Sequence, residues 1–351
     1  MATLATQDVV DLCTSHGFAI AGVSSANRSV HEVAFLQWLQ DEKYGEMEWM
    51  HRNVDVRLDP RNLVEGAKSV ICVADRYGKL EGEVIGEREG QIARYARGCD
   101  YHKTMKKRLH IVCDALREQS SEDVFRGCVD TVPILEREFA QHAGIGAVGK
   151  HTLLIEQGIG SWLFLGAIVT TAAIEPSEEN QSDPCATCTR CIDACPTDAI
   201  TPWEVDARKC ISYLTIEHRG DIAPELYPKI GQWIFGCDIC QEVCPHNQPN
   251  EMSDSAAIHE SYTPRMDSLD VLDVLGWDEN ARREHFRGSA MKRAKLEMIR
   301  RNAVIVAGNI LTLHEDEILL SKLKSIAKDC SEHALVRSAA QDVLLQLEEI
   351  K

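Results

Sequence analysis

Cys185-Ala-Thr-Cys188-Thr-Arg-Cys191-Ile-Asp-Ala-Cys195-Pro196 is the stretch that decides the fold of this 351-residue sequence. Its spacing, C-x2-C-x2-C-x3-C-P, is typical of loops that bind 4Fe–4S clusters. Three thiolates separated by two residues each can wrap one corner of a cubane. The fourth cysteine, displaced onto a helix start, points towards a second cluster. The stretch therefore predicts two iron–sulfur clusters that share one domain.

A second block, Cys237-Asp-Ile-Cys240-Gln-Glu-Val-Cys244-Pro245, keeps the end of this motif but lacks one cysteine. Cys210 lies between the two blocks and can supply the missing thiolate, so that each cluster has four ligands. We assign Cys185, Cys188, Cys191 and Cys244 to one cluster, and Cys195, Cys210, Cys237 and Cys240 to the other.

Zinc is the main alternative, because C-x2-C pairs also build four-cysteine zinc sites. The third cysteine two residues further on, the x3-C-P tail and its repetition favour iron–sulfur. The six other cysteines are scattered, and we interpret them as small buried apolar side chains. They are Cys13, Cys72, Cys99, Cys113, Cys128 and Cys330.

The composition is that of a globular protein with two or three domains, since 44% of the residues are hydrophobic and 26% are charged. The net charge of −17 does not attract phosphate at long range, so a nucleic-acid partner would need a local group of basic residues. The N-terminus has no apolar run of signal-peptide length, and no stretch is long enough to span a membrane. We therefore expect a cytoplasmic protein.

The region before the cysteines mixes helical and strand patterns. Helices are predicted over 7–16, 30–44 and 101–119, and buried strands over 69–74 and 162–171. Gly144, Gly146 and Gly149 match G-x-G-x-x-G, but a strand, a turn and another strand follow them. This order argues against a dinucleotide site, which needs a helix there. We expect the glycines to let the backbone approach a large cofactor.

Residues from about 251 onward are dominated by helical patterns. Two segments, RRNAVIVAGNIL (300–311) and VRSAAQDVLLQL (336–347), share a small and apolar pattern. They indicate either two helical repeats of HEAT type or an ordinary helical bundle. Residues 281–301 carry eight basic and two acidic side chains, a net charge of +6. A basic helix of this kind is suited to contact an RNA backbone, although a solvated helix face is the alternative.

The flanking regions are longer than an electron carrier needs, and their motifs resemble one family. These motifs are CVDTVPILEREFA (128–140), GIGAVGKHTLLI (144–155), DARKCISYLTIEHRG (206–220), IFGCDICQEVCPHNQ (234–248) and FRGSAMKRAKLEMIRRNAVIVAGN (286–309). Together they resemble epoxyqueuosine reductases, from Arg57 to about Asn309, in the order found in that family.

The resemblance implies an α+β multidomain chain. Residues 1–175 would be an α/β cobalamin-binding catalytic domain, 176–250 a ferredoxin-like domain with two 4Fe–4S clusters, and 251–351 a HEAT-like helical domain that binds tRNA. Such enzymes reduce epoxyqueuosine to queuosine at the wobble position (34) of tRNA, the last step of queuosine biosynthesis. Cobalamin, an external electron donor, a tRNA substrate, no membrane partner and a monomeric state are implied with it.

The resemblance also implies site residues. Asp130 would donate the proton to the opened epoxide, provided that burial raises its pKa towards neutrality. The residues implied near cobalamin are Arg57, Arg97, Tyr101, Asp130, Lys150, Thr152, Ser212 and Tyr213. Those implied to contact tRNA are Arg287, Lys292, Arg293 and Lys295.

Two other functions stay open on the sequence. One is a cobalamin-dependent enzyme similar to reductive dehalogenases, against which the basic segment and the helical C-terminus argue. The other is a non-catalytic iron–sulfur electron carrier or scaffold. The sequence departs from the usual family residues at Cys99, His151 and His246, and none of these is a predicted cluster ligand.

Overall fold

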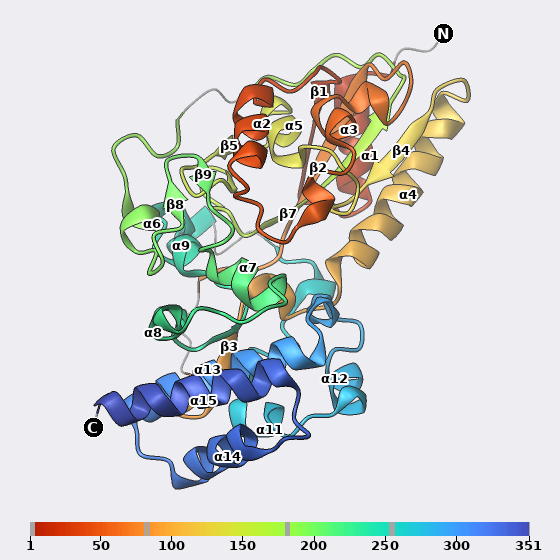
Figure 1. Cartoon of the computed structure of the whole chain (residues 1–351). Coiled ribbons are helices and arrows are strands. Elements are labelled where there is room, and N and C mark those ends of the chain that lie inside the picture. Colours follow the sequence, from red (N-terminus) through yellow and green to blue (C-terminus); the bar gives the residue numbers. More distant parts are fainter. Residues whose placement is uncertain (1–3, 81, 83–84, 180–182, 253–256, 351) are drawn as a thin grey trace.

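The computed structural model describes residues 4–350 except 81, 83–84, 180–182 and 253–256 (Figure 1). Its main sheet has four antiparallel strands in the order β1 (Ile20–Ser25), β2 (Ser69–Arg76), β7 (Leu163–Thr170) and β4 (Phe125–Cys128). The strands predicted over 69–74 and 162–171 are β2 and β7. Every residue of β2 is buried, which explains why its sequence is an apolar run without alternation.

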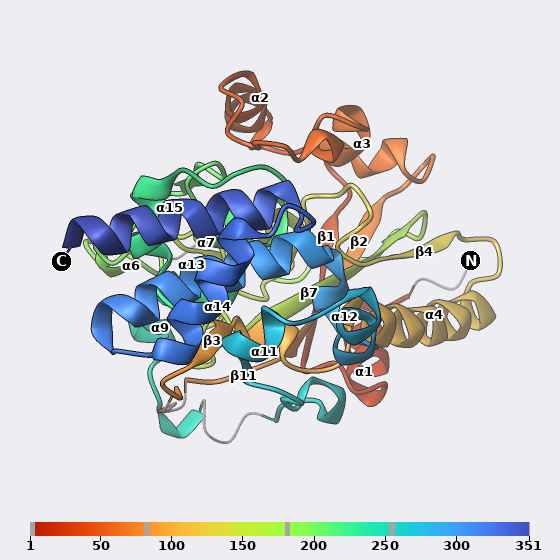
Figure 2. The ribbon, with the colours of Figure 1, turned by 60° about the horizontal axis from the view of Figure 1, so that its bottom comes forward.

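Helices cover both faces of this sheet, so the first part of the chain has three layers (Figures 1 and 2). On one face, Ile71 and Val73 share a core with α1 (Thr6–Ser15) and α4 (Tyr101–Gln119). On the other face, Val70 and Cys72 share a core with α5 (Glu136–His142). The helix predicted over 101–119 is confirmed with these bounds, because its apolar residues face the sheet at helical spacing.

β5 (Ala147–Val148) lies within the glycine motif and pairs with β6 (Leu154–Ile155), so no helix opens there, in agreement with the argument against a dinucleotide site. The reason for the glycines differs from the expectation. A Cβ at Gly144 would collide with the carbonyl oxygen of Glu178, and one at Gly146 with that of Ile155. The chain's own backbone therefore requires glycine at these two positions.

A second sheet joins the three parts of the chain. β3 (Glu89–Ile92) lies between β10 (Trp233–Phe235), which is parallel to it, and β11 (Ser268–Asp270), which is antiparallel. One strand thus comes from each of the ranges 1–175, 176–250 and 251–351, and one hydrophobic core continues from Ile92 to Val343. The sheet and its core cross the boundaries predicted for three domains.

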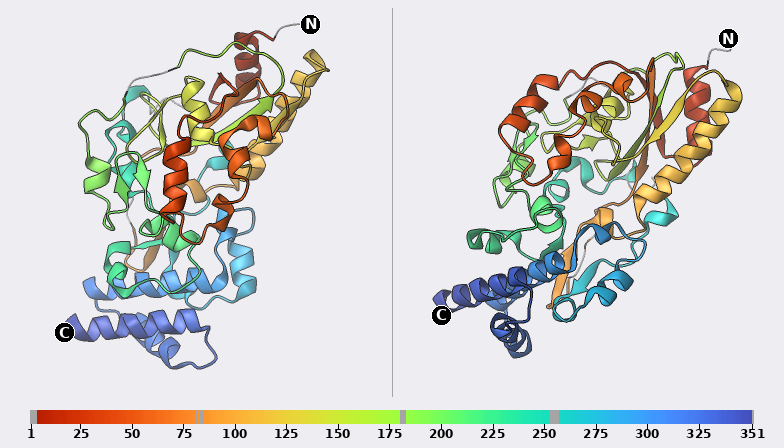
Figure 3. Two further views of the ribbon diagram at one scale, coloured as in Figure 1. Left: turned by 45° about the horizontal axis from the view of Figure 1, so that its top comes forward. Right: turned by 45° about the vertical axis from the view of Figure 1, so that its right-hand side comes forward.

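The C-terminal region consists of α11 (Val271–Val274), α12 (Glu279–His285), α13 (Leu296–Leu313), α14 (Glu317–Lys328) and α15 (Ala334–Ile350). The two similar segments lie in α13 and α15, which pack against each other (Figure 3). A Cβ at Gly308 would come 2.6 Å from Cγ1 of Val343, so glycine permits this close crossing. The HEAT-type interpretation stays a prediction.

Short elements connect these layers. The remaining helices and strands are α2 (Glu32–Gln40), α3 (Val54–Leu58), α6 (Arg190–Asp193), β8 (Ile200–Thr201), β9 (Glu204–Val205), α7 (Ile211–Ile216), α8 (Tyr227–Ile230) and α9 (Ile239–Glu242). The 3-10 turns are Glu48–Met50, Pro60–Asn62, Arg94–Ala96, Pro224–Leu226, Pro245–Asn247, Glu260–Tyr262 and Ala290–Arg293. Among the helices of the described residues, none is long and apolar enough to cross a membrane.

Candidate active site and cluster-binding cysteines

The first predicted set of cysteines gathers where the loop before α6 meets the end of α9. Burial raises the pKa of the Cys244 thiol to about 11, and the charges of Cys185, Cys191 and Cys188 act in the same direction. Such an effect requires short distances between the thiols. The four thiols therefore lie within electrostatic range of one another, which a single four-cysteine site requires.

The second predicted set surrounds Cys240. Burial raises the pKa of this thiol, and the charges of Cys210 and Cys195 add to the effect. Burial also raises the pKa of the Cys237 thiol, and the charges of Cys240 and Cys210 raise it further. Cys191, a member of the first set, also acts on Cys240, so the two sets are neighbours. This arrangement supports the crossed ligand assignment, in which Cys195 and Cys244 each bind the cluster held mainly by the other cysteine block. The assignment stays a prediction.

The donor atoms suit clusters better than single ions. All fourteen cysteines are described, and all are free thiols. Within the described part of the chain, no three His, Cys, Asp or Glu side chains converge on the position of one metal ion. A cubane places each thiolate on a different iron, so it needs no such convergence. Backbone N–H groups of Lys150 and Ala199 donate to the sulfurs of Cys185 (3.3 Å) and Cys195 (3.4 Å), where they would stabilise thiolates.

Asp130 lies two residues beyond β4 in a strained backbone conformation, with φ of +42°. Its backbone N–H donates to Oε1 of Glu136 (2.8 Å), which holds the turn. The Asp130 side chain is 54% exposed, so a substrate can reach its carboxylate.

His102 connects Asp130 to a second carboxylate. Its Nε2 lies 2.8 Å from Oδ2 of Asp130, and its Nδ1 lies 2.8 Å from Oδ1 of Asp100. Only an imidazolium donates from both nitrogens. Burial lowers the pKa of His102, but the hydrogen bonds to Asp100 and Asp130 outweigh it and raise the pKa to about 9. Asp100 also pairs with Lys292, so the chain of contacts ends on the C-terminal region.

The expected protonation of Asp130 is wrong for this structure. Partial burial raises the pKa of Asp130, but the hydrogen bond and charge of His102 outweigh it and hold the pKa below its usual range. The proton therefore resides on His102 at neutral pH. Burial and the neighbouring charge of Asp130 raise the pKa of Glu136 to about 8, which adds a second proton-holding group beside Asp130.

Three of the predicted cofactor residues gather near Asp130. The ring of Tyr101 stacks on Phe164, with centroids 4.1 Å apart and planes 7° apart. Arg57 is buried; burial lowers its pKa, while Glu136 and Asp130 act to raise it, and its Nε has no hydrogen-bond partner. Thr152, at φ of +67°, accepts from Arg137 at its backbone oxygen (2.9 Å).

The other predicted cofactor residues lie elsewhere. Lys150 donates its Nζ to the backbone oxygens of Ala186 (2.7 Å) and Cys188 (3.0 Å), so it fixes the first cysteine loop. Arg97 is buried and donates to the oxygen of Ile92 beside β3. Ser212 and Tyr213 follow Cys210, and their backbone N–H groups hydrogen bond to its thiol. Among the described residues, the hydrogen bonds of Lys150, Ser212 and Tyr213 do not reach Asp130.

Sequence reasoning missed His102, Glu136 and Arg137. His102 directly follows Tyr101, and the two others lie in the motif that contains Asp130. The sequence signal that could have identified them is their position, because each is a charged or titratable residue close to a predicted site residue. Burial lowers the pKa of Arg137 while the charges of Glu136 and Asp130 act to raise it, so Arg137 lies near both carboxylates, and its side chain is exposed.

The basic segment is not one helix. It is divided among α12, the turn Ala290–Arg293 and the start of α13. Arg287, Lys292, Arg293 and Lys295 are all exposed. Arg293 forms two 2.9 Å hydrogen bonds with Glu217, and Lys295 lies 3.9 Å from Glu297.

Part of the predicted charge is not on the surface at all. Arg301 is 0% exposed and donates to the backbone oxygens of Leu214, His218 and Gly220. Arg300 pairs with Glu332 (2.6 Å), and Arg282 pairs with Glu279 (2.6 Å). The net charge of +6 therefore overstates the basic surface, because these side chains hold the C-terminal region to residues 214–220 and to itself.

The three departures from the family pattern have separate environments. The Nε2 of His246 lies 2.8 Å from the backbone oxygen of Pro184, next to the first cysteine loop. His151 is buried, and burial lowers its pKa to about 4, so it is neutral. Cys99 is exposed, and its backbone N–H donates to Ser261.

The pKa of His102 predicts a pH dependence of stability. A pKa raised from 6.5 to about 9 means that the stabilisation is complete below pH 6.5 and is lost as the pH rises through about 9. We expect His102→Gln to have a lower melting temperature than the wild type at pH 6.5, and the difference to shrink towards about pH 10. Thermal unfolding at a series of pH values measures this. A difference that stays constant over the range would contradict the ion pair.

Known proteins match the chain along most of its length. A family described as "4Fe-4S double cluster binding domain" matches residues 184–247, and one described as "Epoxyqueuosine reductase QueG, DUF1730" matches residues 57–131. An epoxyqueuosine reductase of Xanthomonas campestris is 38% identical over 93% of this chain and 91% of its own length. One of Leadbetterella byssophila is 39% identical over 83% of this chain and 94% of its own length.

Solved structures show the same fold. The epoxyqueuosine reductase of Streptococcus thermophilus is 25% identical, with a TM-score of 0.86 over 98% of this chain and 90% of that one. An epoxyqueuosine reductase solved with an epoxyqueuosine-modified tRNA-Tyr stem loop is 24% identical, with a TM-score of 0.84 over 97% and 89% of the two chains. With two cysteine sets, an accessible aspartate and relatives at this identity over nearly its full length, the chain belongs to the epoxyqueuosine reductase family.

Proposed function

We propose that this protein reduces epoxyqueuosine to queuosine at the wobble position (34) of tRNA, as the last step of queuosine biosynthesis. The observation that carries the proposal is the hydrogen-bonded pair of Asp130 and His102 in a family member with two neighbouring cysteine sets. Overall, two electrons and two protons convert the epoxide into an alkene and water.

In this proposal Asp130 and His102 serve the proton side of the reaction. The carboxylate of Asp130 faces the substrate, and His102 replenishes the proton that Asp130 passes to the departing oxygen. At neutral pH the imidazolium holds that proton, because its pKa is about 9. The pair can therefore act as an acid although the pKa of Asp130 itself is low.

Cobalamin is the cofactor that this family uses, and the residues near Asp130 suit a corrinoid. The stacked rings of Tyr101 and Phe164 offer a flat apolar surface, and the unpartnered Nε of Arg57 offers a donor for a polar substituent. When bound, the corrinoid supplies low-valent cobalt as the reductant, with electrons delivered through the clusters. Tyr101, Arg57 and Thr152 would hold it, while Lys150, Ser212 and Tyr213 shape the cluster side of the site.

The wider proposal concerns partners and domains. The tRNA would contact Arg287, Lys292, Arg293 and Lys295, with their carboxylate partners exchanged for phosphates. Residues 1–175, 176–250 and 251–351 would be the cobalamin, cluster and HEAT-like tRNA-binding regions of a monomer. We place the enzyme in the cytoplasm, where tRNA and an external electron donor are present.

One experiment tests the function. The protein is reconstituted anaerobically with iron, sulfide and cobalamin, and its corrinoid absorption is recorded after removal of free cofactor. It is then incubated with epoxyqueuosine-containing tRNA and a chemical reductant, and the nucleosides are analysed by mass spectrometry. We expect corrinoid absorption and conversion to queuosine. Corrinoid binding without conversion would show that epoxyqueuosine-containing tRNA is not the substrate. Absence of corrinoid binding would favour the alternative function of an electron carrier.

A further inference from the structure

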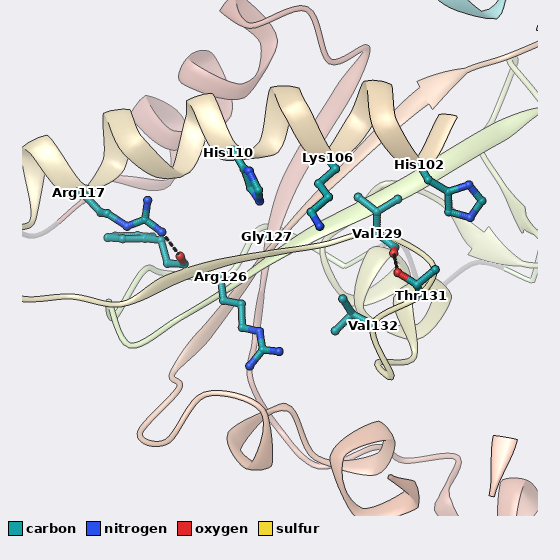
Figure 4. Close-up of a pocket in the computed structure, with 10 residues that line it drawn as sticks. His102, Lys106, His110, Arg117, Arg126, Gly127, Val129, Thr131 and Val132 are labelled. Carbon is teal, nitrogen blue, oxygen red and sulfur yellow. Dashed lines mark hydrogen bonds between the residues drawn. The ribbon is translucent and has the colours of Figure 1, made fainter. Parts of the chain in front are cut away.

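A cavity of about 380 Å³ lies between α4 and β4, directly beside the candidate site (Figure 4). Its lining comes from these two elements and the turn after β4. The lining residues are His102, Lys106, His110, Arg117, Phe125, Arg126, Gly127, Val129, Thr131 and Val132. In Figure 4, Lys106 and His110 point from α4 towards β4, across the space beside Gly127.

The lining is cationic and contains no carboxylate. Lys106 and His110 are exposed, and among the described residues neither forms an ion pair or a side-chain hydrogen bond. Arg126 extends from β4 away from α4 in Figure 4 and donates to the backbone oxygen of Leu63 (3.1 Å), so it does not face Lys106 and His110. Arg117 pairs with Asp114 (2.5 Å). An anion is the occupant that such a lining favours.

The shape of the cavity also depends on the glycine at position 127, which has no side chain. A Cβ at Gly127 would come 3.4 Å from Cβ of Leu109 and 3.6 Å from Cδ2 of His110. A larger side chain at this position would therefore fill the space next to His110. Glycine keeps the floor of the cavity open, and a tetrahedral anion can approach the backbone of β4.

The position of the cavity favours the substrate over the cofactor. One end is lined by His102, which contacts Asp130, and the other by Arg117 near the end of α4. In Figures 1 and 2, α4 extends away from α6 and α9, which carry cluster cysteines. A cofactor that receives electrons from the clusters must lie on their side of Asp130. The cavity lies on the opposite side, where a substrate can enter.

We propose that this cavity binds a backbone phosphate of the RNA substrate through Lys106 and His110. The inference rests on the proposed function and adds a phosphate contact next to the reacting base. The protein carries a net charge of −17, so an RNA needs unpaired local cations to bind. Three of the four predicted tRNA contacts are already paired with carboxylates, whereas Lys106 and His110 have no such partner.

The test uses two adjacent lysines. Lys106 and Lys107 are both exposed on α4, but only Lys106 lines the cavity. Lys106→Ala and Lys107→Ala therefore remove the same charge from neighbouring positions. Full-length, cofactor-loaded proteins are titrated into a fluorescent epoxyqueuosine-containing anticodon stem loop, and anisotropy is measured at several salt concentrations.

We expect Lys106→Ala to weaken RNA binding about 5- to 10-fold and to reduce the slope of log K against log salt by about 0.7–0.9, the value for one lost phosphate contact. Lys107→Ala should stay within about twofold of the wild type. Equal losses in both variants, or no loss in either, would overturn the inference while leaving the proposed function intact. Failure of the wild type to bind the RNA would instead overturn the proposed function.

A second measurement distinguishes an RNA phosphate from a cofactor phosphate as the occupant of the cavity. It is needed because the nucleotide tail of cobalamin also carries a phosphodiester. Binding of cobalamin and of cobinamide, which lacks that tail, is compared by absorption for the wild type and Lys106→Ala. Unchanged binding of both supports the RNA phosphate. A loss confined to cobalamin would assign the cavity to the cofactor tail and overturn the inference. Melting temperatures show whether each variant is folded.

Discussion

Replacing Asp130 with asparagine is expected to lower the rate of epoxyqueuosine reduction by about 10²- to 10⁴-fold, the usual contribution of a positioned acid or base. Asparagine keeps the size of the side chain and tolerates the positive φ of +42° at this position. It also retains the backbone N–H that donates to Glu136. The variant therefore removes the proton carrier without rebuilding the turn. Alanine lacks that tolerance, so its effect would mix chemistry with backbone strain.

The matched control is the state of the cofactors in the same variant. Iron content and corrinoid absorption should equal those of the wild type, because Asp130 is not a cluster ligand. His102→Gln should lower the rate as well and should remove the decline in activity that we expect of the wild type as the pH passes about 9. Wild-type turnover by Asp130→Asn, with intact cofactors, would remove Asp130 from the mechanism.

Replacing Cys210 with alanine is expected to remove one cluster and leave the other. Cys210 precedes α7 and lies outside both cysteine blocks, yet burial and the charge of Cys195 both act on its thiol. The iron content should fall from about eight to about four per chain, since each cluster holds four irons. Reduction of epoxyqueuosine should be lost, because the remaining cluster alone does not complete the electron path.

The control for this variant is Cys330→Ala, which removes an exposed cysteine between α14 and α15. It should keep about eight irons and full activity. Iron and sulfide analysis, with electron paramagnetic resonance of the reduced protein, distinguishes one cluster from two. Two intact clusters in Cys210→Ala would show that the cysteine blocks bind independently and that the crossed assignment is wrong.

The features that the sequence determined are those encoded at short range. The period of apolar residues over 101–119 became α4 with the same bounds, and the apolar run at 69–74 became the buried β2. The cysteine spacing predicted two clusters, in agreement with the family match over 184–247. In each case a local repeat is sufficient, because helix pitch, strand burial and loop geometry act between residues a few positions apart.

Only the tertiary structure decided which charges are available for function. The sequence showed Lys292, Arg293 and Arg301 as one basic segment, but packing paired the first two with acids and buried the third. It also brought His102 to Asp130 and so moved the proton from the expected carboxyl group to the imidazole. These partners come from distant parts of the chain. A pKa or a surface charge depends on burial and on such neighbours, and neither is encoded by local spacing.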